Sequence, residues 1–141
     1  MIYIEVDGGC RENHGYMGIG VSVFIDGKLN AQISRSIRGS SSLDAELLAI
    51  AHALKLAEQM NFNEAYIVTD CSSCIDIINN RAKNNKGRKL ILRVIRKIRE
   101  DKPRLSITWM NRNSVETAHE LAYLAMERYR KRLNFPSILN S

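Results

Sequence analysis

The sequence predicts an α/β domain in which a mixed five-stranded sheet carries helices on both faces. Two observations predict this class. The first 37 residues show only strand patterns, with a strong hairpin signal at Asp26-Gly27. Beyond residue 42, apolar repeats of helical spacing alternate with two short apolar strands. An antiparallel meander followed by strand–helix alternation is typical of a mixed sheet that is covered on both sides.

Three strands account for the N-terminal part of the chain. The segment Ile2–Asp7 alternates between apolar and other side chains, as a half-buried strand does. Tyr16–Ile25 is rich in β-branched residues with interspersed glycines, and Lys28–Ile37 is expected to return antiparallel to it after the hairpin turn. A polar Gly/Ser loop is expected at Arg38–Ser42.

Six further elements follow from the apolar spacing and from the positions of glycine and proline. A cap at Ser42 or Asp44 begins the first helix. In order, the six elements are a helix to about Met60, a strand at Ala65–Asp70, a short helix at Cys71–Asn80, an amphipathic helix at Arg88–Glu100, a strand at Leu105–Met110 and a last helix at Val115–Leu133.

Length and composition indicate one globular domain, which we place at residues 1–134, followed by a tail at residues 135–141. Hydrophobic residues make up 45% of the chain and charged residues 26%, as in an ordinary globular protein. No apolar run reaches the roughly 20 residues that cross a bilayer, and no basic leader precedes the first strand. With its three cysteines expected to be reduced thiols, the chain is predicted to be cytoplasmic, monomeric and without a membrane partner.

The positive charge is concentrated in one segment. Arg81–Arg104 holds eleven basic and two acidic residues, a net charge of +9, whereas the rest of the chain holds ten basic and thirteen acidic residues, a net of −3. A basic segment on a slightly acidic body favours contact with a phosphate backbone. The alternative is a solvated helix face that binds nothing.

Three acidic residues occupy positions that a buried scaffold does not favour. Asp7 follows an apolar strand and precedes two glycines, Glu46 lies near the start of an otherwise apolar helix, and Asp70 ends a second apolar strand. Carboxylates that converge near strand ends repel one another unless a cation lies between them. The pattern therefore predicts a metal site, whereas each residue taken alone could be a helix cap or a solvated strand end.

Four motifs in this order resemble those of the type 1 ribonucleases H, over about residues 2–132. They are Asp7-Gly8-Gly9-Cys10, Ala45-Glu46-Leu47, Thr69-Asp70 and Ala118-His119-Glu120-Leu121-Ala122. The resemblance implies that strands one to three are antiparallel and that strands one, four and five are parallel. It also implies a metal-dependent endonuclease that hydrolyses the RNA strand of RNA/DNA hybrids to 5′-phosphate and 3′-hydroxyl products.

By the same resemblance, Asp7, Glu46 and Asp70 ligate two Mg²⁺ or Mn²⁺ ions that lie about 4 Å apart. The family usually carries a fourth Asp where this chain has His119, which we take as the fourth catalytic and metal-binding residue. Glu116, one helical turn earlier, is the alternative. Because imidazole is a poor ligand for Mg²⁺, we expect Mn²⁺ to support activity better.

The resemblance also implies which groups contact the hybrid, through 2′-hydroxyls and backbone phosphates. These positions are Gly8, Cys10, Asn13, Ser41, Ser42, Ser72, Lys86, Arg88, Lys89, Arg93 and Arg112. The loop before the last helix is short and has no histidine, and the basic helix lacks the aromatic platform of the family's extended handle. The chain therefore resembles a short-loop form without the basic handle.

Two other functions stay open. The first is a weak or inactive domain of the same fold that only binds nucleic acid, because His119 replaces a carboxylate. The second is a nuclease that acts on DNA or structured RNA, since one fold supports several chemistries. In addition, Cys71-Ser72-Ser73-Cys74 has the spacing of a redox pair or of half a zinc site, although helix packing after Asp70 also explains both cysteines.

Overall fold

The structure is a computed structural model that describes residues 1–11, 15–81 and 86–134, with side chains given except at residue 86 and residues 129–134. Within these ranges one five-stranded sheet has the order β3-β2-β1-β4-β5. The strands are β1 (Ile2–Arg11), β2 (Tyr16–Ile25), β3 (Lys28–Arg38), β4 (Ala65–Thr69) and β5 (Leu105–Trp109). β1, β2 and β3 pair antiparallel, and β4 pairs parallel with both β1 and β5, as predicted.

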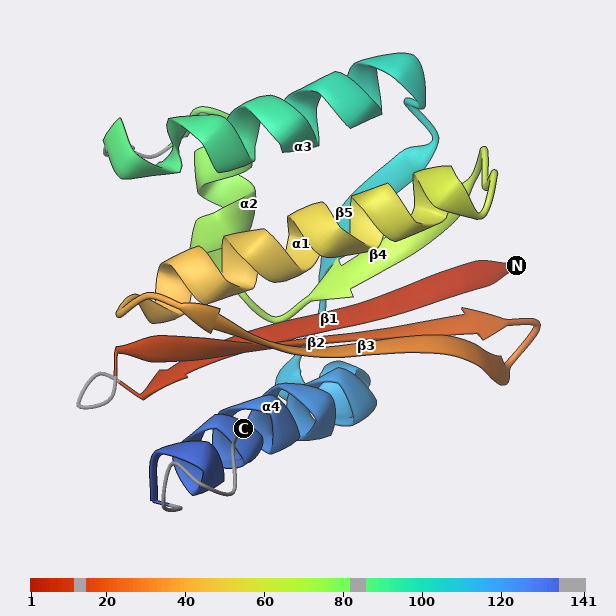
Figure 1. Cartoon of the computed structure of the whole chain (residues 1–141). Helices are drawn as coiled ribbons and strands as arrows, with labels where there is room; N and C mark the ends of the chain where they lie inside the picture. The colour runs from red at the N-terminus through yellow and green to blue at the C-terminus, as the bar shows by residue number, and fades with distance from the viewer. Residues whose placement is uncertain (12–14, 82–85, 135–141) are drawn as a thin grey trace.

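In the same ranges four α-helices cover the two faces of the sheet (Figure 1). They are α1 (Ser42–Gln59), α2 (Ser72–Ile78), α3 (Lys89–Asp101) and α4 (Glu116–Asn134), with 3₁₀ turns η2 (Lys86–Arg88) and η3 (Arg112–Val115). α1 packs on the sheet with α3 behind it, and α4 lies on the opposite face. The predicted fold class and order of elements are confirmed. None of the described helices is both long and apolar enough to cross a membrane.

Both covering helices approach the sheet at glycines. A Cβ added to Gly8 of β1 would lie 2.3 Å from the backbone carbonyl carbon of Ala45 in α1. A Cβ on Gly20 of β2 would lie 1.9 Å from the carbonyl oxygen of Ala118 in α4. Backbone at such distances cannot yield to a side chain. The glycines therefore set how closely α1 and α4 lie to the sheet, and so how far their side chains reach around β1.

The predicted end of the first strand at Asp7 was wrong. β1 continues to Arg11, because its second half pairs antiparallel with β2, from Asp7 opposite Gly20 to Arg11 opposite Tyr16. Its parallel pairing with β4 stops earlier, at Glu5 opposite Val68. Asp7 thus lies inside a strand on the β2 side but beyond the last β4 pair on the other side. This divergence of β1 from β4 opens the space in which the acidic residues meet.

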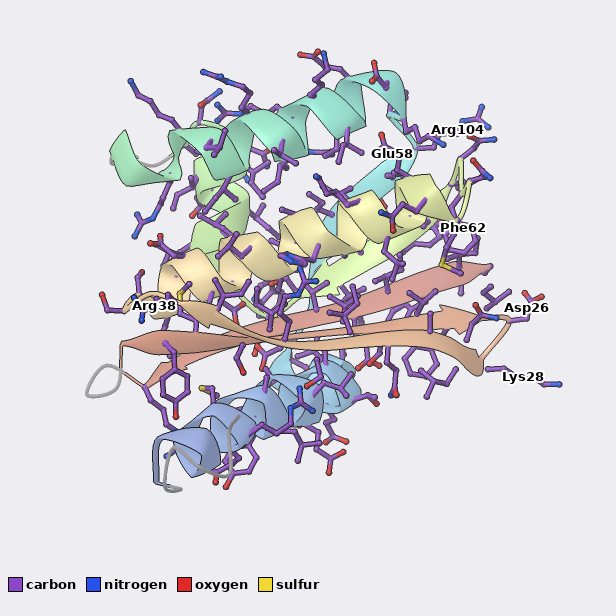
Figure 2. All side chains as sticks on the ribbon, viewed as in Figure 1. Asp26, Lys28, Arg38, Glu58, Phe62 and Arg104 are labelled. Atoms are coloured by element: carbon purple, nitrogen blue, oxygen red, sulfur yellow. The ribbon has the colours of Figure 1, made fainter. Side chains whose placement is uncertain are left out.

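The predicted N-cap of α1, Ser42 or Asp44, was wrong. Ser41 is the N-cap, since its Oγ accepts a hydrogen bond from the backbone N–H of Asp44 at 3.2 Å. Ser42 is the first helical residue, and the Asp44 carboxylate instead pairs with Arg88 Nε at 2.5 Å. This ion pair joins the N-terminal ends of α1 and α3. Figure 2 shows Arg38 at this end of the molecule and the Asp26–Lys28 turn at the opposite end of the β2–β3 hairpin.

Candidate active site

Three carboxylates from three different elements meet where β1 and β4 diverge. Asp7 comes from β1, Glu46 from the first turns of α1, and Asp70 directly follows β4. Each offers a carboxylate oxygen that lies within 4.8 Å of an oxygen of the other two. Like charges at this separation in a partly buried site repel strongly unless a proton or a cation intervenes. The cluster that the sequence predicted is therefore present.

Glu46 is held in place by the backbone of β1. Its Oε1 accepts a hydrogen bond from the Gly8 N–H at 2.8 Å, while Oε2 is buried and has no hydrogen-bond partner among the described residues. The residue is only 9% exposed. Burial, followed by the neighbouring Asp7, raises the pKa of Glu46 to about 10. A buried carboxylate with one unpaired oxygen is costly in a core and is well suited to bind a cation.

The other two carboxylates differ in their exposure. Asp7 is 6% exposed, whereas Asp70 lies nearer the surface. Partial burial and then the Asp7 charge raise the pKa of Asp70. The indole Nε1 of Trp109 donates to the backbone carbonyl of Asp70 at 3.1 Å, which fixes the chain just beyond β4. Three oxygen donors of this kind fit a hard divalent cation such as Mg²⁺ or Mn²⁺.

His119 contacts Asp7 but lies outside the group of mutually close carboxylates. Its Nδ1 lies 2.7 Å from Asp7 Oδ2, and its Nε2 lies 3.0 Å from Arg112 Nη2. Because a carboxylate can only accept hydrogen bonds, Nδ1 carries the proton that is donated to Asp7. Arg112 Nη2 also lies 3.4 Å from Nδ1, so the guanidinium contacts the ring as a whole. In this arrangement Nδ1 is engaged with Asp7, and a metal could bind this nitrogen only by displacing that contact.

Two cavities that share Arg112 and His119 lie at the site, and one of them is lined by the three carboxylates. The first, of about 210 Å³, is lined by Asp7, Glu46, Asp70, Arg112 and His119, among others. The second, of about 390 Å³, is lined by Arg112, Asn113, Glu116, His119 and Glu120. Glu116 therefore shares the second cavity with His119 and is not among the residues that line the first cavity.

The predicted hybrid-binding residues fall into four groups, of which Lys89 and Arg93 on α3 are the last. Gly8, Cys10, Ser41, Ser42, Ser72 and Arg112 belong to the strand, turns and helix starts around the carboxylates. Arg88 is engaged in the ion pair with Asp44 and its side chain is only 14% exposed. Asn13 and the side chain of Lys86 lie outside the described residues.

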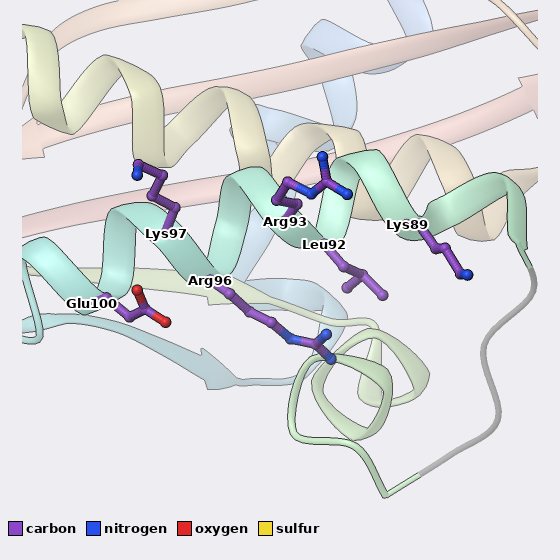
Figure 3. Close-up of a pocket in the computed structure, with 6 residues that line it drawn as sticks. All are labelled: Lys89, Leu92, Arg93, Arg96, Lys97 and Glu100. Carbon is purple, nitrogen blue, oxygen red and sulfur yellow. The ribbon is translucent and has the colours of Figure 1, made fainter.

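Lys89 and Arg93 lie on the exposed part of α3. They line a shallow cavity of about 510 Å³ together with Leu92, Arg96, Lys97 and Glu100, as Figure 3 shows. Arg96 turns toward α2, where its Nη2 donates to the Ile77 and Ile78 carbonyls and to Asn80 Oδ1. The exposed cations of α3 that the structure leaves available to a ligand in this cavity are thus chiefly Lys89, Arg93 and Lys97.

Sequence reasoning missed the residues of β1 that hold α4. Glu5 Oε1 accepts from the backbone N–H groups of Thr117 and Ala118 at 3.2 and 3.4 Å, at the start of the helix. Tyr3 donates from its hydroxyl to the Ser114 carbonyl at 3.0 Å. The available signal was the alternation of β1, which puts both residues on the face of Asp7. They orient the helix that carries His119.

A family model described as reverse transcriptase-like matches residues 5–125 of the chain. The chain belongs to this family. Curated proteins provide no significant match. Among solved structures, the N-terminal ribonuclease H domain of Rv2228c from Mycobacterium tuberculosis, solved as a maltose-binding-protein fusion, superimposes with a TM-score of 0.83 at 23% identity, over 94% of this chain and 97% of that one.

Two further ribonucleases H are similar over nearly their whole length. The RNase H1 of the archaeon Halobacterium salinarum gives a TM-score of 0.82 at 22% identity, covering 90% of this chain and 98% of that one. LC11-RNase H1, isolated from compost by a metagenomic approach, was solved in complex with an RNA/DNA hybrid. It gives a TM-score of 0.81 at 25% identity, covering 92% and 99%. The chain is a type 1 ribonuclease H-like domain, as the motifs indicated.

Proposed function

We propose that this protein is a divalent-metal-dependent endoribonuclease that hydrolyses the RNA strand of RNA/DNA hybrids, leaving 5′-phosphate and 3′-hydroxyl ends. The observation that carries the proposal is the convergence of Asp7, Glu46 and Asp70 within 4.8 Å. The fold shared with LC11-RNase H1, which binds a hybrid, supports the substrate class.

Asp7, Glu46 and Asp70 would hold the cations. Bound divalent ions supply an activated water and stabilise the charge that develops on the leaving oxygen. Other groups of the chain would position the ligands and the substrate. Gly8 fixes one Glu46 oxygen through its N–H, and Arg112 adds a positive charge at the rim of the same cavity. A guanidinium at that place suits a phosphate oxygen of the RNA strand.

His119 would act chiefly through Asp7. Its Nδ1–H bond to Asp7 Oδ2 orients that carboxylate, and the Arg112 guanidinium contacts the imidazole ring beside it. The number of carboxylates is then three where the family usually has four. We propose that the missing carboxylate weakens binding of the cation on the side of the attacking water. Mn²⁺ should then support cleavage better than Mg²⁺, because it accepts a nitrogen ligand more readily when His119 leaves Asp7 to complete the site.

The hybrid would extend from the carboxylates toward the N-terminal ends of α1 and α3. Those two ends lie side by side, joined by the Asp44–Arg88 ion pair. Ser41, Ser42 and Ser72 offer small polar groups near the site for 2′-hydroxyls. Lys89 and Arg93, farther along this path, offer charges for phosphates. Arg88 would contribute indirectly, because its ion pair with Asp44 holds the N-terminal ends of α1 and α3 together.

The test is a cleavage assay on matched RNA/DNA hybrid, duplex DNA and duplex RNA, each with Mg²⁺ or Mn²⁺, with Asp7→Asn beside the parent. We expect the parent to cut only the RNA of the hybrid, faster with Mn²⁺, and Asp7→Asn to be inactive. Hybrid binding without cleavage by the parent would instead identify a binding domain. Preferential cutting of duplex DNA or duplex RNA would identify the other nuclease class.

A further inference from the structure

A second group of metal-binding side chains lies against the carboxylate cluster. Glu46, Cys71 and Cys74 each offer a ligand atom within 4.8 Å of the other two. Glu46 thus belongs both to this group and to the group formed with Asp7 and Asp70. α1 contributes the carboxylate, and the start of α2 contributes both thiols.

The two thiols are arranged for binding by one ion. Cys71 is the N-cap of α2, where its Sγ accepts the Cys74 backbone N–H at 3.3 Å. Spacing by three residues places both side chains on the same turn of the helix. Neither cysteine is in a disulfide. Cys74 is fully buried and Cys71 is partly exposed, so Cys71 provides the path by which an ion enters.

The buried side chain of Glu46 indicates that a ligand belongs at the junction of the two groups. Its Oε1 is bound to Gly8, but its Oε2 is buried without a hydrogen-bond partner among the described residues. The residue is about nine-tenths buried, at 9% exposure. A buried oxygen of this kind is rarely left unpaired in a native protein. It can be satisfied from the side of the aspartates or from the side of the thiols.

We propose that Glu46, Cys71 and Cys74 form an inhibitory site for thiophilic divalent cations such as Zn²⁺. A cation bound there would take an oxygen of Glu46 as a ligand, and it would therefore compete for Glu46 with the ions that cleavage requires. Zinc takes thiolate at about 2.3 Å and carboxylate at about 2.0–2.2 Å in a tetrahedron, which places its ligand atoms roughly 3.5–4 Å apart. The observed upper bound of 4.8 Å is compatible with that geometry after small shifts.

The chemistry is ligand exchange without oxidation. The ion forms two bonds to sulfur and one to a Glu46 oxygen, the protons of the two thiols and of the Glu46 carboxyl pass to solvent, and water fills the fourth position. Soft thiolates favour zinc over magnesium, whereas Asp7, Glu46 and Asp70 together favour hard cations. The two groups therefore differ in metal preference but share one ligand. Only the inhibition rests on the proposed function; the binding does not.

Cd²⁺ is the probe for binding, because its thiolate complexes have an ultraviolet charge-transfer band that carboxylate complexes lack. The variant is Cys71→Ser, since serine preserves the N-cap of α2. Cys10→Ser is the matched control for removal of a thiol outside the group. We expect the parent and Cys10→Ser to show the band at one equivalent of Cd²⁺. Cys71→Ser should lose part of the band and bind Zn²⁺ at least about tenfold more weakly, because even residues outside the ligand set contribute that much.

The competition for Glu46 is tested separately. Glu46→Gln should keep the Cd²⁺–thiolate band but weaken Zn²⁺ binding, a result that needs no catalytic activity. In the parent, Zn²⁺ added at saturating Mg²⁺ should stop hybrid cleavage, and Cys71→Ser should require at least about tenfold more Zn²⁺ for the same inhibition. Absence of the band, equal Zn²⁺ affinity in Cys71→Ser, or equal affinity in Glu46→Gln would overturn the proposal. An inactive parent with these binding results intact would refute the proposed function and leave the thiol site standing.

Discussion

The helices α1 and α4 bring one side chain each to Asp7 from opposite faces of the sheet, and they do so in different ways. Glu46 of α1 is 9% exposed and bound to the backbone of β1. The His119 side chain of α4 is 46% exposed, and its partners among the described residues are the side chains of Asp7 and Arg112. Glu46 is therefore buried in the packing between α1 and the sheet, whereas His119 lies at the surface.

This difference has a structural origin. At Gly8 the backbone of α1 lies so close to β1 that a single methyl group would not fit. α4 is equally close at Gly20, but His119 projects from the exposed side of the helix toward Arg112. The position of Glu46 therefore depends on the core, while the position of His119 depends on two polar contacts. We expect substitutions on the α1 side to have larger effects than those on the α4 side.

The largest effect is expected for Glu46→Gln. Loss of this ligand should lower the rate of hybrid cleavage about 1000-fold or more, because bound cations contribute several kcal/mol to such reactions and each 1.36 kcal/mol is a factor of ten. The control is Glu58→Gln, on the exposed far end of the same helix (Figure 2). Single-turnover cleavage measures both. Equal rates for Glu46→Gln and the parent would show that α1 contributes no residue that cleavage requires.

Gly8→Ala tests whether the core sets the α1 side. The new methyl group would lie 2.3 Å from the Ala45 backbone, so α1 must move away, and we expect the free energy of unfolding to fall by about 2–4 kcal/mol. The adjacent Gly9→Ala is the control. Its Cβ would meet only the flexible end of Met126 at 2.9 Å, which should cost less than about 1 kcal/mol. Urea unfolding compares them, and equal losses would contradict the close-packing argument.

His119→Ala tests the exposed side. If the imidazole orients Asp7, its removal should lower cleavage by about 10- to 100-fold, as is typical of residues that position a metal ligand, with little loss of stability. His119→Asn, which retains an N–H donor, should recover part of the activity. A loss as large as that of Glu46→Gln, with no recovery in His119→Asn, would instead indicate that His119 binds the metal directly.

The last expected effect is a pH dependence of stability in the metal-free protein. The pKa of Glu46 is raised by burial to about 10, and that of Asp70 is raised in the same direction. The folded state then binds more protons than the unfolded state, so stability falls as pH rises through neutrality toward pH 10. Denaturant unfolding in EDTA at pH 6 and pH 9 should show this fall. Glu46→Gln or added Mg²⁺ should reduce it, and a parent that gains stability with pH would contradict the assigned direction.

The sequence was sufficient for the order of elements and for the three acids, because apolar periodicity and turn residues are local signals. It could not show that β1 continues past Asp7, since that depends on pairing with β2. Nor could it show that Arg88 is paired with Asp44, because the partners are 44 positions apart. The sharing of Glu46 between carboxylates and thiols was missed for the same reason: it depends on how α1 and α2 meet in space.

The central claim is that Asp7, Glu46 and Asp70 together hold a divalent cation. Calorimetric titration of the metal-free protein with Mn²⁺ tests it without substrate. Asp7→Asn is the test variant, and Asp26→Asn, at the exposed β2–β3 turn, is the control. We predict saturable Mn²⁺ binding by the parent and the control, and at least about tenfold weaker binding by Asp7→Asn. Equal Mn²⁺ affinity in Asp7→Asn and the parent would contradict the claim.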